Sequence, residues 1–115
     1  MINKLSKKKN SNQKWNRVHN FQRKKTNKHR VGHPVLVYGK RGRFSKYLVF
    51  THTPESGKEN DYEKLKHNID PSEDGKRDTW VKKNYEVSTS NSLRQPDKKY
   101  RIHDSDKETI KKYKK

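Results

Sequence analysis

Residues 33–52 read HPVLVYGKRGRFSKYLVFTH, with two apolar runs on either side of a basic turn that contains glycine. The runs at 35–38 and 47–51 are rich in β-branched and aromatic residues, which favour strands. Glycines at 39 and 42 bracket the basic residues between the runs, as is typical of a β-hairpin turn. The sequence therefore predicts a hairpin whose two strands are mostly buried.

The rest of the chain after Gly32 adds a strand and a helix to this hairpin. Residues 79–87 alternate as a strand does, with Val81, Tyr85 and Val87 on one face together with Lys83. Residues 53–60 and 68–78 have the composition of loops. Ser105 and Glu108 have the spacing of a capping box, with Asp106 also favourable in the first turn. Ile110 and Tyr113 then share one face of a short helix. These elements predict a small, strand-dominated α+β domain over residues 32–115 with a C-terminal helix.

Residues 1–31 contain eleven Lys and Arg and no Asp or Glu, and so hold more than half of the formal net charge of +18. High net charge with few apolar residues is typical of disorder, so we expect a disordered basic arm here. Nucleic acid is the expected partner, because its phosphates are dense and release counterions on binding. Trp15 could stack on unpaired bases, with Arg17 and Arg23 on phosphates; the alternative, which a free arm favours, is an exposed ring in a flexible tail.

Composition excludes several classes of protein. The chain has no Cys, which excludes disulfides and thiolate zinc sites, and its six His are not spaced with carboxylates as metal ligands are. The glycines match no nucleotide-binding motif, so we expect neither a metal nor a cofactor. No secretory signal is visible, nor an apolar run of the ~20 residues that a membrane span needs. We therefore expect a soluble, cytoplasmic protein without a membrane partner.

The hairpin turn is the sharpest cluster of positive charge in the predicted domain. Its cations lie close to glycines that let backbone amides approach a ligand, so side chains and amides together can hold a phosphate. With the arm and the predicted third strand, the candidate nucleic-acid-binding residues are Lys7, Lys8, Lys9, Trp15, Arg17, Arg23, Lys24, Lys25, Lys40, Arg41, Arg43, Lys46, Lys82 and Lys83.

A candidate catalytic group lies at the other end of the hairpin. His33 precedes the first strand and His52 follows the second, so antiparallel pairing brings the two together. Acid–base cleavage of RNA needs one imidazole to take the 2′-hydroxyl proton and another to protonate the leaving oxygen. Thr51 could bond a phosphate oxygen between them. The alternative, which the spacing alone favours, is that both histidines merely flank the strands.

The segments HPVLV, from His33, and YLVFTH, ending at His52, resemble the opening of the MazF/PemK toxins. Those are small barrels that cleave RNA in bacterial toxin–antitoxin pairs. The strand at 79–87, a loop and a capped helix keep the family's order over residues 33–113. The resemblance implies an SH3-like or MazF-like partial barrel, metal-independent cleavage and an acidic antitoxin.

The chain departs from the pattern of that family at the candidate site. The family's arginine before proline is His33 here, its threonine is Thr51, and its following serine is His52. Cations that could replace the arginine at a phosphate are Arg41, Arg43, Lys82 and Lys83.

The sequence favours nucleic-acid binding through a cationic arm and a cationic hairpin, with RNA preferred to duplex DNA. Cations alternate with aromatic residues, which suits unpaired bases, and no recognition helix is visible. The alternatives are a toxin-type endoribonuclease and a phage or mobile-element factor that binds and blocks a nucleoprotein machine. An acidic protein or a nucleoprotein complex is then a possible partner, and whether the chain is an enzyme stays open.

Overall fold

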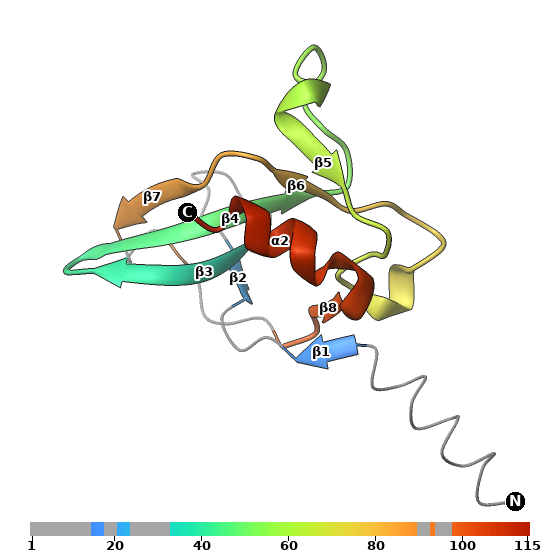
Figure 1. Cartoon of the computed structure of the whole chain (residues 1–115), viewed down its shortest axis with the longest axis horizontal. Helices are drawn as coiled ribbons and strands as arrows, with labels where there is room; N and C mark the ends of the chain where they lie inside the picture. The colour runs from blue at the N-terminus through green and yellow to red at the C-terminus, as the bar shows by residue number, and fades with distance from the viewer. Residues whose placement is uncertain (1–14, 18–20, 24–32, 90–92, 94–97) are drawn as a thin grey trace, which may run out of the picture.

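A computed structural model describes residues 15–17, 21–23, 33–89, 93 and 98–115 of the chain. Strands dominate the fold, and its two longest strands form a hairpin (Figure 1). β3 covers Pro34–Arg41 and β4 covers Phe44–Thr51. Their antiparallel pairing confirms the predicted hairpin.

The hairpin turn is shorter than the sequence predicts. Strand pairing continues out to Arg41 and Phe44, so that only Gly42 and Arg43 connect the strands. Gly42 has a φ of 61°, which suits the first central residue of a type II′ turn. A β-bulge shifts the register between Val37 and Gly39, and bulges bend a strand and increase its twist.

The described strands pair antiparallel throughout, in one six-stranded sheet and one two-stranded ribbon. The sheet has the order β2-β3-β4-β6-β5, with β7 paired to β4 beside this path, and the ribbon joins β1 to β8. Within the described residues the sheet stays open, with β2 and β5 at its edges. The remaining strands are β1 Trp15–Arg17, β2 Phe21–Arg23, β5 Tyr62–Lys64, β6 Trp80–Lys82, β7 Glu86–Thr89 and β8 Arg101–His103.

The continuous strand predicted over 79–87 is wrong, because residues 83–85 interrupt it. β6 pairs with Phe50 and Thr51 near the end of β4, whereas β7 pairs with the opposite half of β4 near the turn. The bend lets two short strands use different parts of one long neighbour. Val81 is consequently buried, while Tyr85 and Val87 are exposed, although the predicted alternation placed all three on one face.

Two strands lie in the segment that the sequence predicts to be a disordered arm. β1 pairs with β8, and β2 pairs with β3. The Phe21 ring is fully buried, with its centroid 5.4 Å from the Phe50 ring and 5.4 Å from the Tyr100 ring. Disorder is therefore the wrong prediction for 15–17 and 21–23, because distant partners supply their pairing; the rest of 1–31 lies outside the described residues.

The core lies between the sheet and a C-terminal helix, α2 (Lys107–Tyr113), which crosses the hairpin in Figure 1. Ile110 and Tyr113 are buried, as predicted. A smaller cluster on the opposite face joins Val35, Tyr47, Val49 and Leu93. No helix in the described residues is long and apolar enough to cross a membrane. The main core consists of Phe21, Leu36, Leu48, Phe50, Leu65, Ile69, Val81, Tyr100, Ile102, Ile110 and Tyr113.

The predicted capping box at the start of this helix is wrong. Residues 104–106 form a 3-10 turn, and no side chain caps the start of α2 by a hydrogen bond. The Ser105 hydroxyl lies 2.7 Å from Nδ1 of His103 instead. Asp106 is buried, and its carboxylate accepts the backbone N–H groups of Lys66 at 2.7 Å and His67 at 3.0 Å. This carboxylate therefore ties the loop after β5 to the beginning of α2.

The far end of α2 is tied to β5 by a second polar contact. The Tyr113 hydroxyl donates a hydrogen bond to Glu63, and Nζ of Lys112 lies 3.1 Å from the same carboxylate. The hydrogen bond from Tyr113 and the charge of Lys112 lower the pKa of Glu63. The helix is thus fixed at both ends.

Candidate nucleic-acid interface

The outer half of the hairpin extends beyond α2. The side of the sheet that faces the core continues onto this half. Alternate residues of a strand share a face, so Phe44 and Lys46 lie on the side of Leu48 and Phe50, which enter the main core. The hairpin end projects past the helix in Figure 1. Among the described residues, no helix therefore covers the side chains nearest the turn.

Strand pairing assembles cations and apolar groups on this uncovered surface. Arg41 pairs with Phe44 across the hairpin, and Lys46 pairs with Val87 of β7. We call Arg41, Phe44, Lys46, Tyr85 and Val87 the hairpin face. The exposed fractions are 51% for Phe44, 53% for Val87 and 39% for Tyr85, which are high for such large apolar side chains.

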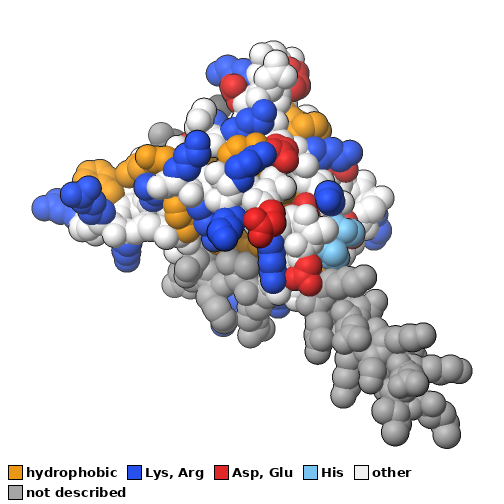
Figure 2. Space-filling model, in the orientation of Figure 1, with side chains coloured by type: hydrophobic (Ala, Val, Ile, Leu, Met, Phe, Trp, Pro, Cys, Tyr) orange, Lys and Arg blue, Asp and Glu red, His pale blue; other side chains and the backbone are white. Residues whose placement is uncertain are grey.

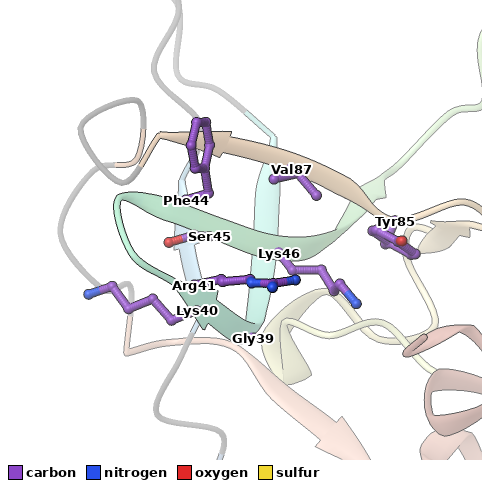
Figure 3. Close-up of a pocket in the computed structure, with 8 residues that line it drawn as sticks. All are labelled: Gly39, Lys40, Arg41, Phe44, Ser45, Lys46, Tyr85 and Val87. Atoms are coloured by element: carbon purple, nitrogen blue, oxygen red, sulfur yellow. The ribbon is translucent and has the colours of Figure 1, made fainter.

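The hairpin face lines a pocket of about 640 Å³, together with Gly39, Lys40 and Ser45 (Figure 3). Among the described residues that line the pocket there is no Asp or Glu. Figure 2 shows hydrophobic and basic side chains next to one another at this end of the molecule. The described lining therefore has no acidic side chain to repel an anion, and the exposed rings offer flat surfaces to a ligand.

Lys46 has a defined position within this surface. Its Nζ lies 4.5 Å from the centroid of the Tyr85 ring and 5.8 Å from that of Tyr38, and these two rings meet edge to face at 6.4 Å. The same Nζ donates a hydrogen bond to the main-chain oxygen of Lys115 at 2.9 Å. Burial raises the pKa of Tyr38, so this phenol stays neutral at physiological pH. The ammonium group is thus held between ring faces by cation–π attraction.

Some of the cations that the sequence predicts to bind nucleic acid lie on or near the hairpin face. Lys40, Arg41 and Lys46 line the pocket, and Arg43 is exposed in the turn. In Figure 3 the Lys40 side chain extends away from that of Arg41. The hairpin turn is accordingly basic on both sides of the sheet.

The other predicted binding residues lie elsewhere or outside the described chain. Nζ of Lys82 lies 3.0 Å from the Glu86 carboxylate, and the Lys83 backbone N–H donates to the main-chain carbonyl oxygen of Asp61 at 2.9 Å. Trp15 is half-buried, with its ring edge-on to His103 at 4.9 Å, so it is packed against the fold. Only the backbone of Arg17 and Arg23, in β1 and β2, is described. Residues outside the described part of the chain are Lys7, Lys8, Lys9, Lys24 and Lys25.

The predicted catalytic residues do converge on one pocket. His33, Thr51 and His52 line a space of about 330 Å³, whose walls include the buried rings of Phe50 and Tyr100. No Lys or Arg is among its described lining residues. The described lining therefore supplies two imidazoles and threonine hydroxyls, but no lysine or arginine for a phosphate.

Thr51 and His52 each contact a nearby main-chain carbonyl oxygen. The Thr51 hydroxyl donates to the Thr53 carbonyl at 3.0 Å, and Nδ1 of His52 lies 3.3 Å from the Asp78 carbonyl oxygen. Both contacts fix the side chains locally. Because a carbonyl oxygen only accepts, Nδ1 of His52 carries the hydrogen in this contact. In the neutral ring, Nε2 is then the acceptor.

Sequence reasoning found the cations of the hairpin face but missed its apolar groups. Phe44 directly follows the basic turn, outside the apolar run at 47–51, and this displaced position is the signal that could have indicated exposure. Tyr85 and Val87 were expected to share a face with buried Val81. Only the bend at 83–85 separates them from the core.

Comparison of the chain with protein-family models, with curated proteins and with solved structures finds no match.

Proposed function

We propose that this protein binds nucleic acid through the hairpin face, and that it takes unpaired RNA in preference to duplex DNA. The observation that carries this proposal is the presence of the exposed Phe44 and Tyr85 rings beside Arg41 and Lys46. Rings of this kind stack on bases, and cations beside them neutralise phosphates.

The shape of the surface favours an unpaired strand over a duplex. Bases in a duplex are stacked on each other and cannot reach a ring on a protein surface, whereas unpaired bases can. The one α-helix in the described residues has seven residues and buries Ile110 and Tyr113 against the sheet. The described residues therefore offer no free helix that could enter a major groove.

The net charge of +18 supports the same class of partner. Each phosphate that a Lys or Arg neutralises releases counterions, so affinity falls as salt rises. The charge accounts for attraction without sequence preference. The rings of the hairpin face would then select unpaired strands.

The test is fluorescence anisotropy with a labelled single-stranded RNA and a duplex DNA of the same length. Phe44→Ala and Tyr85→Ala should each weaken RNA binding about five- to hundredfold, because stacking on one base is worth about 1–3 kcal/mol. Arg41→Ala should instead reduce the salt slope by about one unit.

Val87→Ala is the matched control for the ring variants. Val87 is as exposed as Phe44 and lies on the same face, but it has no ring to stack. We expect Val87→Ala to lose less affinity than either ring variant, because the substitution removes apolar contact but no stacking. Equal losses in Phe44→Ala and Val87→Ala, or equal affinity for RNA and duplex, would contradict the proposal.

A second candidate function is a metal-independent endoribonuclease with a fold of the SH3-like or MazF-like kind. The convergence of His33, Thr51 and His52 on one pocket favours it. Total RNA incubated in chelator should then be cut to products with cyclic phosphate ends. The activity should disappear in His33→Ala and in His52→Ala, and intact RNA with the wild-type protein excludes this function.

A further inference from the structure

The segment after α2 reaches back to the hairpin face through Lys115. The main-chain oxygen of Lys115 accepts a hydrogen bond from Nζ of Lys46 at 2.9 Å, and the Lys115 backbone N–H donates to the Tyr38 hydroxyl at 3.2 Å. Lys114 and Lys115 themselves are exposed. We call these two residues the C-terminal latch. One residue thus joins the helix end to a cation and a tyrosine at the edge of the proposed binding surface.

This contact uses Lys46 in a way that opposes ligand binding. An ammonium group has three N–H donors, and here a main-chain oxygen takes one of them while the rings of Tyr85 and Tyr38 occupy its surroundings. The cation is therefore partly satisfied before any phosphate arrives. A phosphate brings several charged oxygens and can bond to Arg41 as well, so it can compete with this single oxygen.

We infer that the C-terminal latch is an autoinhibitory contact that a nucleic acid must displace from Lys46 and Tyr38. The inference rests on the function proposed above, since it concerns the regulation of the same site. Displacement frees the Lys46 ammonium group and the Tyr38 hydroxyl together, and it extends the surface from the turn toward α2.

The backbone allows the latch to open without unfolding the helix. Lys114 leaves the helical conformation, with a φ of −76° and a ψ of 101°. Immediately before it, Tyr113 is buried, and its hydroxyl bonds to Glu63. Opening therefore breaks the two hydrogen bonds of Lys115 and leaves α2 in place.

Two substitutions of Lys115 distinguish the effect of losing the hydrogen bond to Tyr38 from the effect of losing the positive charge. Lys115→Pro and Lys115→Ala both remove one positive charge, but only proline also removes the N–H that bonds to Tyr38. The extended Lys114 is compatible with a following proline, so no helical turn is lost. Tyr38→Phe removes the acceptor from the other side while keeping the ring and the net charge.

The measurement is the affinity of each full-length variant for the labelled single-stranded RNA, at one salt concentration. We expect Lys115→Pro to bind roughly two- to fivefold tighter than Lys115→Ala, and Tyr38→Phe to bind tighter than wild type by a similar factor, because one hydrogen bond is lost from the free protein. Equal or weaker binding by Lys115→Pro and by Tyr38→Phe would overturn the latch.

A measurement without RNA separates failure of the latch from failure of the proposed function. In ¹H–¹⁵N spectra of the free protein, Tyr38→Phe should shift the Lys115 amide, and an unmoved amide would show that the latch does not form. A shifted amide in a protein of which no variant binds RNA would reject the binding function, and autoinhibition with it.

Discussion

Replacing Phe21 by Ala should largely unfold the protein. The side chain is fully buried and contacts the rings of Phe50 and Tyr100, and its strand pairs with β3 through Leu36. Removing a buried ring of this size costs about 3–5 kcal/mol. The total free energy of unfolding of a small domain is at the low end of about 5–15 kcal/mol, so most of it would be lost. Urea denaturation followed by circular dichroism measures the loss.

Gln22→Ala is the control for this experiment, because Gln22 lies on the same strand and is only half-buried. Its effect should stay below about 1 kcal/mol. If Phe21→Ala were equally mild, β2 would not belong to the folded core. Residues 1–31 would then be the independent arm that the sequence predicts.

The same contact determines how the basic segment can be tested for binding. A chain that begins at residue 32 would lack Phe21, β1 and β2, so a loss of RNA affinity could reflect unfolding. Removal of residues 1–14 takes away five lysines and spares both strands. A shallower salt slope in that shorter chain would show that the lysines contact phosphates.

The parts of the fold that were predicted are those that depend on neighbouring residues in the sequence. The hairpin has a continuous apolar pattern and a glycine turn, and α2 has two apolar residues three apart, so both were found. β1 and β2 have three residues each and pair with strands far along the chain. Nothing within such short segments indicates strand structure, because the distant partner supplies it.

The candidate site shows the same division between local and distant causes. The basic turn was visible because its cations are close in sequence. The exposure of Phe44, Tyr85 and Val87 depends on how far α2 reaches along the sheet and on the bend at 83–85. The bond from Lys46 to Lys115 joins residues 69 positions apart, and no spacing rule predicts a contact over that separation.

Asp106 is the clearest case of a residue whose role changed with the structure, and its loss should be the second most damaging change. The sequence placed it in the first turn of a helix, where a carboxylate is mildly favourable. In the structure it is buried and accepts two backbone N–H groups, from Lys66 and His67. Asp106→Ala would leave both donors without this partner, at a cost of about 3 kcal/mol in the free energy of unfolding.

Two matched variants distinguish the effect of losing the Asp106 carboxylate from the effect of any substitution in this region. Asp106→Asn keeps one acceptor oxygen but turns its NH₂ group toward the other donor, so it should lose an intermediate amount. Glu108→Ala removes an exposed carboxylate two residues away, in the first turn of α2, where such a charge contributes about 0.3–1 kcal/mol. Urea denaturation should therefore show the largest loss in Asp106→Ala, a smaller one in Asp106→Asn and the smallest in Glu108→Ala. Equal losses at the two positions would contradict the assignment.

The loss at Asp106 should also reach β1, through a chain of ring contacts. His67, whose N–H the carboxylate holds, stacks on His103 with ring centroids 3.7 Å apart, and the Trp15 ring lies 5.7 Å from His67. When the loop at His67 loosens, Trp15 should become more exposed. In a Trp80→Phe background, where Trp15 is the single tryptophan of the sequence, the fluorescence should therefore move to longer wavelength below the urea midpoint. In Glu108→Ala the loop keeps its anchor, so the emission should stay where it is without that substitution. A Trp15 signal unchanged in Asp106→Ala would show that the position of β1 does not depend on the loop at His67.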